Sequence, residues 1–97
     1  MRLIQLVPRL TTDAAQTLWL EIETECDSPG QPGVRLNASG VRHLGAAGLQ
    51  VLLIARARLH REGGRLEIEA PSDEFLAGLD HMGAPDLMTA DLIGGAA

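Results

Sequence analysis

The chain has 97 residues, the size of one domain, and its 45% apolar residues are enough for a single hydrophobic core. Eight arginines and no lysine stand against 13 acidic residues, so the net charge is −5, the wrong sign for a surface that follows a phosphate backbone. Nucleic acid is therefore not an expected partner, and two aromatic residues, Trp19 and Phe75, are too few for a base-stacking platform.

Cysteine content and hydrophobic run lengths bound the location of the chain. The single cysteine, Cys26, needs no oxidising compartment to explain it. No run approaches the roughly 20 apolar residues that cross a bilayer, and Pro8 interrupts the apolar start before it could form a signal-peptide core. We expect a cytoplasmic protein without direct membrane insertion, made of one domain over residues 1–97, with a frayed tail at 94–97.

Strands and helices are predicted to alternate three times. In chain order they are a strand from Leu3 to Val7, a helix from Asp13 to Cys26, a strand from Val34 to Ala38, a helix from Ala46 to about Arg61, a strand from Arg65 to Glu69, and a helix from its cap at Ser72 to its stop at Gly83. Residues after Pro85 are expected to add one short turn. This order predicts an α/β fold, with a small, mainly parallel or mixed sheet of about three to four strands and helices packed on it.

The helix that begins at Ala46 carries apolar residues on two sides. At 100° per residue, one side is expected to face the sheet: Gly48, Leu52, Ala55 and Leu59. The opposite side is expected to point outward, with Leu49 on its flank: Ala46, Gln50, Leu53, Ala57 and His60. A solvated helix usually shows charged residues there. This surface is therefore either covered by the chain itself, for instance by the first helix or in a homodimer, or kept for a partner.

The turn that enters this helix, Gly45-Ala-Ala-Gly48, lacks any hydroxyl, carboxylate, thiol or imidazole. Its main-chain amides could cradle a phosphate, but the Lys and the Ser or Thr of a P-loop are absent. The histidines, His43, His60 and His81, lack the spacing of a metal site. No nucleophile has a base beside it. We expect neither an enzyme nor a protein with a metal or cofactor.

Several segments in order resemble the STAS domain, the fold shared by bacterial anti-sigma factor antagonists and by regulatory domains of sulfate transporters. They are Pro8-Arg-Leu-Thr11, Val34-Arg-Leu-Asn-Ala-Ser-Gly-Val41, the turn Gly45-Ala-Ala-Gly-Leu49, Arg61-Glu-Gly-Gly-Arg-Leu-Glu-Ile68 and Pro71-Ser72. Members usually open with an extra strand before the one matched by Leu3 to Val7. A sheet edge is therefore expected to be open here, which invites self-association or cover by a partner.

The resemblance implies a docking function. In antagonists of this family the turn reads Asp-Ser-Ser-Gly; an anti-sigma kinase phosphorylates its first hydroxyl, and the unphosphorylated helix face binds that kinase. Here the matching position is Ala46, so the resemblance implies a degenerate member that cannot be phosphorylated at this turn. The expected partner-binding residues are those of the turn and of the outward helix face: Gly45, Ala46, Ala47, Gly48, Leu49, Gln50, Leu53 and Ala57.

Three functions stay open. The first is an interaction module for an anti-sigma, kinase-like or signalling protein, for example in chemotaxis. The second is a regulatory subunit of a membrane transport ATPase, of the lipid-transport kind. The third is a small-ligand or nucleotide sensor that uses the helix N-terminus at Gly45 to Gly48.

Overall fold

The computed structural model describes residues 2–27, 30, 33–83 and 92–93. The three predicted helices are present as α1 (Thr12–Cys26), α2 (Ala46–Arg61) and α3 (Asp73–His81). The three predicted strands are present as β1 (Arg2–Gln5), β3 (Gly33–Asn37) and β5 (Arg65–Glu69). Three strands of two residues each were not predicted: β2 (Arg9–Leu10), β4 (His43–Leu44) and β6 (Leu92–Ile93).

The main sheet has the strand order β1-β3-β5-β6, and all of its neighbouring strands run parallel. In register, Ile4 of β1 lies beside Leu36 of β3, which lies beside Ile68 of β5. The predicted α/β fold with a mainly parallel sheet is therefore confirmed. It follows from the strand–helix alternation, because consecutive parallel strands need a crossover connection between them.

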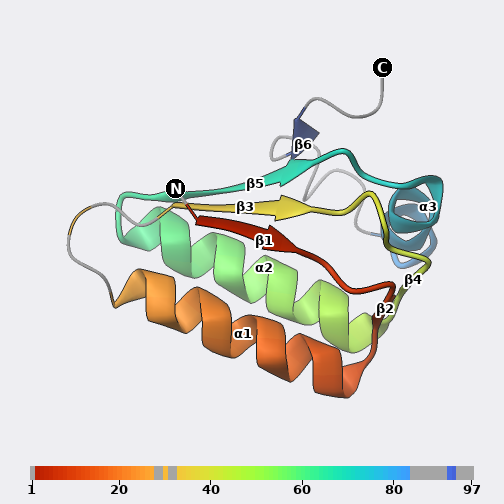
Figure 1. The fold of residues 1–97 in the computed structure, drawn as a ribbon, viewed down its shortest axis with the longest axis horizontal. Helices are drawn as coiled ribbons and strands as arrows, with labels where there is room; N and C mark the ends of the chain where they lie inside the picture. The colour runs from red at the N-terminus through yellow and green to blue at the C-terminus, as the bar shows by residue number, and fades with distance from the viewer. Residues whose placement is uncertain (1, 28–29, 31–32, 84–91, 94–97) are drawn as a thin grey trace.

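Helices α1 and α2 lie side by side on one face of the sheet, as Figure 1 shows, and the core fills the space between the two layers. The core-facing strand residues, such as Val34 and Leu36, are fully buried. Alternate residues on the other face are polar: Arg35 pairs with Glu67 across the strands at 3.1 Å, and Asn37 donates to Glu69 at 2.8 Å. This alternation identifies a sheet covered by helices on one face only.

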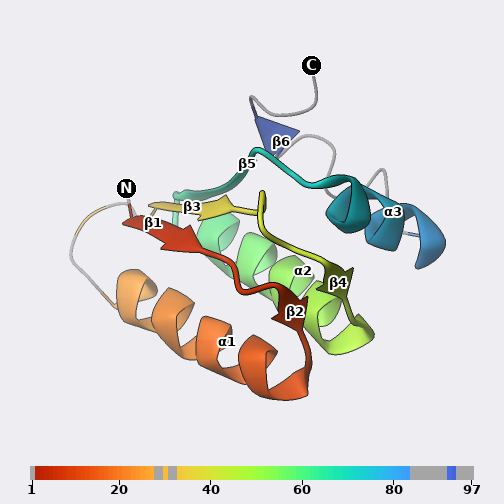
Figure 2. The ribbon, with the colours of Figure 1, turned by 45° about the vertical axis from the view of Figure 1, so that its right-hand side comes forward.

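The two short strands β2 and β4 pair in parallel at the end of the main sheet where α2 begins, and α3 packs beside β4 (Figure 2). The Pro8 carbonyl accepts hydrogen bonds from the N–H groups of Arg42 (2.7 Å) and His43 (3.0 Å), and the Gly45 N–H donates to the Leu10 carbonyl (3.3 Å). These bonds fix the loop before α2 to the loop before α1. They therefore set where both helices start.

Some predicted bounds differ from the structure. Helix α1 begins one residue earlier than predicted, at Thr12, and β3 covers Gly33–Asn37 in place of Val34 to Ala38. Ser72 caps α3 as predicted, since its Oγ accepts from the Phe75 N–H at 3.0 Å. Of the region after Pro85, predicted to add a turn, residues 92–93 form β6; residues 84–91 and the predicted frayed tail at 94–97 lie outside the described residues.

Candidate docking site

The side of α2 that was predicted to face the sheet is buried in the structure. Gly48, Leu52, Ala55 and Leu59 are all buried. Gly48 lies so close to β2 and β4 that an added Cβ would be 2.9 Å from the Leu10 Cβ and 3.3 Å from the Leu44 Cδ1. A glycine is needed here because the helix start touches the small sheet directly, and this contact positions the turn of residues 45–48.

The prediction that Leu49 and Leu53 point outward is wrong for Leu49 and only partly right for Leu53. Leu49 is only 8% exposed and belongs to the buried core, and Leu53 is half-buried and packs against that core. The buried arc of α2 extends beyond the row through Gly48, because Leu49 lies about 100° round the helix from it. A charge at Leu53 would therefore disturb the fold and would not test docking cleanly.

The other predicted site residues divide into two groups. Ala46, Gln50 and Ala57 are exposed, as expected, whereas Gly45 and Ala47 are half-buried. Of the predicted set, Ala47 and Gln50 line a hollow between α1 and α2.

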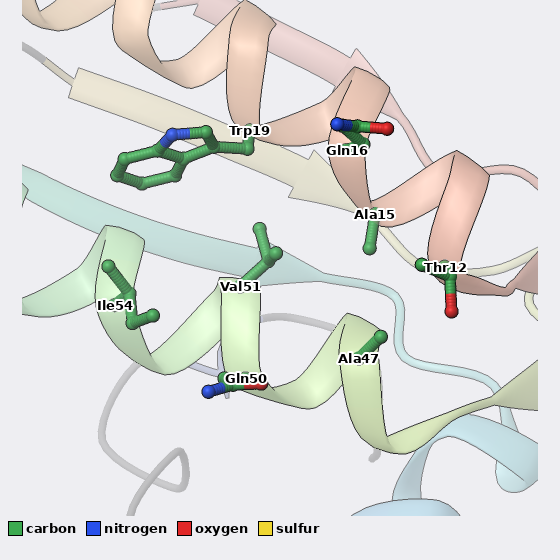
Figure 3. Close-up of a pocket in the computed structure, with 8 residues that line it drawn as sticks. All are labelled: Thr12, Ala15, Gln16, Trp19, Ala47, Gln50, Val51 and Ile54. Atoms are coloured by element: carbon green, nitrogen blue, oxygen red, sulfur yellow. The ribbon is translucent and has the colours of Figure 1, made fainter.

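This hollow, which we call the α1–α2 groove, has a volume of about 450 Å³. Figure 3 shows the side chains on its two walls, four from each helix. They are Thr12, Ala15, Gln16 and Trp19 of α1, and Ala47, Gln50, Val51 and Ile54 of α2. None of these side chains is charged, and the two largest, Trp19 and Ile54, lie at the same end. Concave, mostly apolar surfaces with a few polar groups are typical of binding sites.

The groove is part of the protein surface and not of the core, as the exposure of its side chains and the charged groups at one end show. Ile54 is 48% exposed and Trp19 is half-buried. The Arg58 guanidinium lies 6.0 Å from the centre of the Trp19 ring, within cation–π range. The same arginine forms ion pairs with Asp27 (3.7 Å) and Glu62 (3.6 Å). This end of the groove is thus held by α1–α2 contacts while the apolar surface of Ile54 stays open to solvent.

Comparison with protein families agrees with this architecture. A family model described as "Mlab, STAS domain" matches residues 2–90. The chain belongs to the STAS domain family. A comparison with curated proteins found no match. Within the residues that the structure describes, no helix of this STAS domain is long and apolar enough to cross a bilayer.

At the start of α2, the STAS domain presents main-chain groups and methyl groups alone. Gly45 is the N-cap and provides no side-chain hydrogen bond, and the first turn contains no acidic residue. Ala46 projects from this turn and is exposed. An added Cβ at Gly45 would lie 3.0 Å from the Leu10 carbonyl oxygen, so the turn also packs tightly on its inner side. The surface formed by residues 45–48 has small, uncharged side chains, and it adjoins the groove because Ala47 lines the groove.

The cysteine of the STAS domain does not line the groove. Cys26 is buried at the end of α1, and loss of solvation raises the pKa of its thiol, an effect that the nearby Arg58 partly offsets. A thiol with a raised pKa is a poor nucleophile. In the described part of the chain, no group of three or more His, Cys, Asp or Glu side chains is placed to hold a metal ion.

Six residues of the groove were not predicted as site residues: Thr12, Ala15, Gln16, Trp19, Val51 and Ile54. The helical period places Trp19 in one apolar row with Ala15, Leu18 and Ile22, and the predicted partner-binding face of α2 does not include Val51 or Ile54. The signal was present as two apolar rows at helical spacing, Ala15 and Trp19 on α1 and Ala47, Val51 and Ile54 on α2. Only the side-by-side packing of the two helices turns these rows into the walls of one groove.

Proposed function

We propose that this STAS domain is a non-catalytic interaction module whose partner docks on the start of α2 and in the α1–α2 groove. The observation that carries the proposal is the partly exposed Ile54 in an uncharged groove, continuous with the bare helix start at Ala46. Surfaces with an apolar centre and an aromatic anchor such as Trp19 are typical of protein interfaces.

The magnitude is sufficient for a reversible contact. Complete burial of an isoleucine contributes roughly 1.5–3 kcal/mol, so burial of the exposed half of Ile54 contributes about 1 kcal/mol. Trp19 adds apolar area to the contact. The side chain loses little conformational entropy on binding, because packing and the Arg58 contact already restrict it. A partner that fills the groove with one or two apolar side chains would gain affinity from both walls.

Binding is proposed to be independent of phosphorylation at the turn. Ala46 and Ala47 have no hydroxyl, so neither can accept a phosphoryl group. A phosphate at this point would add about −1.5 to −2 charges to an apolar contact and oppose docking. We infer that this member is either permanently competent to bind or regulated elsewhere, with an anti-sigma, kinase-like or other signalling protein as its partner.

Capture from a lysate of the source organism tests the proposal. The wild-type domain, Ile54→Glu and the matched control Leu3→Glu are immobilised, and the retained proteins are identified. Leu3 is also an exposed apolar residue, but it lies in β1 beside Arg35, which can pair with the new carboxylate. We expect one protein to be retained by the wild type and the control and lost with Ile54→Glu.

If all three forms of the domain retain the same protein equally, the partner does not dock in the α1–α2 groove. The identity of the retained protein separates the pathways: a soluble kinase-like protein supports the signalling module, and a membrane transport ATPase supports a regulatory subunit instead. If nothing is retained, titration of nucleotides while the amide resonances of residues 45–48 are followed by NMR tests the sensor function. Shifts confined to those amides would replace the docking proposal.

A further inference from the structure

The outer edge of β1 carries main-chain groups that no other described strand pairs with. β1 is the first strand in the order β1-β3-β5-β6, with β3 as its neighbour. The Leu6 N–H donates to the Asn37 carbonyl (3.0 Å), and the Pro8 carbonyl accepts from the N–H of Arg42 (2.7 Å). Even-numbered residues therefore direct their main-chain groups inward. β1 ends at Gln5, and the Leu6 hydrogen bond continues its pairing with β3 by one residue. Because these groups alternate along an extended strand, those of Leu3 and Gln5 point outward.

This edge has little of the protection that natural sheets use. Leu3 is 61% exposed and Val7 is 46% exposed, so two of the four large apolar side chains exposed in the described residues lie here. Pro8 lacks an N–H, but its even position places that loss on the inner side. No lysine or outward-facing proline interrupts the residues 3–7. An edge of this kind favours pairing with another strand.

A second hollow lies directly beneath the edge. It has a volume of about 190 Å³ and runs between β1 and α1. Apolar side chains such as Ile4, Leu6 and Leu18 line it, with Glu21 as its one charged residue. A strand added at the edge would extend the sheet over the mouth of this hollow.

We propose that β1 pairs antiparallel with β1 of a second copy of this chain, about a two-fold axis that passes beside Gln5. In an antiparallel pair, side chains directly opposite each other lie on the same face of the sheet. In a symmetric dimer, one residue of the strand must therefore lie opposite its own copy, with the two-fold axis between them. With the axis at Gln5, Leu3 lies opposite Val7 of the partner subunit, and Val7 lies opposite Leu3 of the partner subunit. In this pairing the strand continues from Gln5 to Val7, so Leu3, Gln5 and Val7 each exchange main-chain hydrogen bonds with the partner subunit. The two exposed apolar side chains then pack side by side on the sheet face that no helix covers.

A second copy fits this edge because the patch is self-complementary. The same short segment supplies Leu3 at one end and Val7 at the other, which is what an isologous interface requires. The result is one continuous sheet with the strand order β6-β5-β3-β1-β1-β3-β5-β6. Each chain carries a net charge of −5, so repulsion opposes the pairing and salt screens it. Dimerisation is therefore strengthened by added salt, whereas capture of a basic partner would be weakened.

Cysteine cross-linking of the full chain tests the register. In Gln5→Cys the two new thiols face each other across the axis with their Cα atoms about 5.5 Å apart, inside the range that a disulfide bridges. In Leu3→Cys they lie four residues apart along the strands and are out of reach. The native Cys26 is buried, and the wild type under the same oxidant controls for it. We expect a covalent dimer from Gln5→Cys alone.

Sedimentation velocity over a concentration series, with and without added salt, provides the second readout. The wild type is expected to dimerise, and Leu3→Glu or Val7→Glu is expected to weaken the dimer by about tenfold or more, because a carboxylate replaces the apolar contact on both sides of the axis. Ile54→Glu leaves the dimer intact, so this proposal stands or falls independently of the docking groove. A wild type that stays monomeric at its highest soluble concentration, or a dimer that Gln5→Cys does not cross-link, overturns the proposal.

Discussion

Substitution of Gly48 by alanine tests the contact that positions the docking surface. Gly48 lies in the first turns of α2, where its Cα faces β2 and β4. An added methyl would lie 2.9 Å from the Leu10 Cβ, 3.2 Å from the Leu10 carbonyl oxygen and 3.3 Å from the Leu44 Cδ1. One of these contacts is to backbone, so flexible side chains alone cannot relieve the overlap.

Two opposing effects set the magnitude. Alanine is about 1 kcal/mol more favourable than glycine in a helix interior. Overpacking of a tight contact costs about 1–3 kcal/mol. The net change expected for Gly48→Ala is therefore a loss of between zero and about 2 kcal/mol in the free energy of unfolding, which corresponds to a melting temperature lower by up to about 8–16 °C.

Urea denaturation followed by circular dichroism provides the measurement, and Ala57→Gly is the matched control. Ala57 is exposed on the same helix, so this substitution reports helix propensity alone and is expected to cost about 1 kcal/mol. If Gly48→Ala stabilises the domain by as much as Ala57→Gly destabilises it, the close approach of α2 to the small sheet does not exist.

Two further predictions concern the helix start and the thiol. Ala46→Asp is expected to raise the free energy of unfolding by about 0.3–1 kcal/mol, because the first turn of α2 lacks an acidic residue that would interact with the helix dipole. The same substitution is expected to weaken partner binding, because it adds a negative charge to the docking surface. Lower stability or unchanged affinity, measured on the same sample, would contradict this prediction. Cys26 is expected to react far more slowly with a thiol reagent in the folded protein than in denaturant, because burial raises its pKa, and an equally fast reaction in both states would refute this. The same raised pKa gives stability that is fully present below the pKa of the unfolded thiol, about 8.5, and is lost as the pH rises toward the folded value, which denaturation midpoints measured at increasing pH will show.

Local patterns were sufficient to predict the main elements. The 3.6-residue period identified the buried row through Gly48 and Leu52, and the alternation in Arg65–Glu69 identified a strand with one polar face. Both patterns are local and are repeated several times, so a single sequence carries them. The strands β2 and β4 have two residues each, too few to show a period, and they form only because the loops before α1 and α2 meet.

The docking surface could be predicted only in part, because it depends on how two helices pack. The turn at residues 45–48 was found from its composition, and the exposed Gln50 from helical geometry. The burial of Leu49 depends on core residues that are distant in the sequence, and the groove depends on Trp19 and Ile54 coming to lie on facing walls. Helical geometry gives the direction of a side chain but not which neighbour meets it.

The most direct test of the docking proposal is the dissociation constant of the captured partner for three forms of the domain. Trp19 is the only tryptophan and lines the groove, so its fluorescence reports occupation of the site. We predict that wild type and Leu3→Glu bind with the same affinity and shift the Trp19 emission, whereas Ile54→Glu binds about tenfold or more weakly, because a carboxylate must lose water in an uncharged groove. Equal affinity of Ile54→Glu and wild type, or binding that leaves the Trp19 emission unchanged, would contradict docking in the α1–α2 groove.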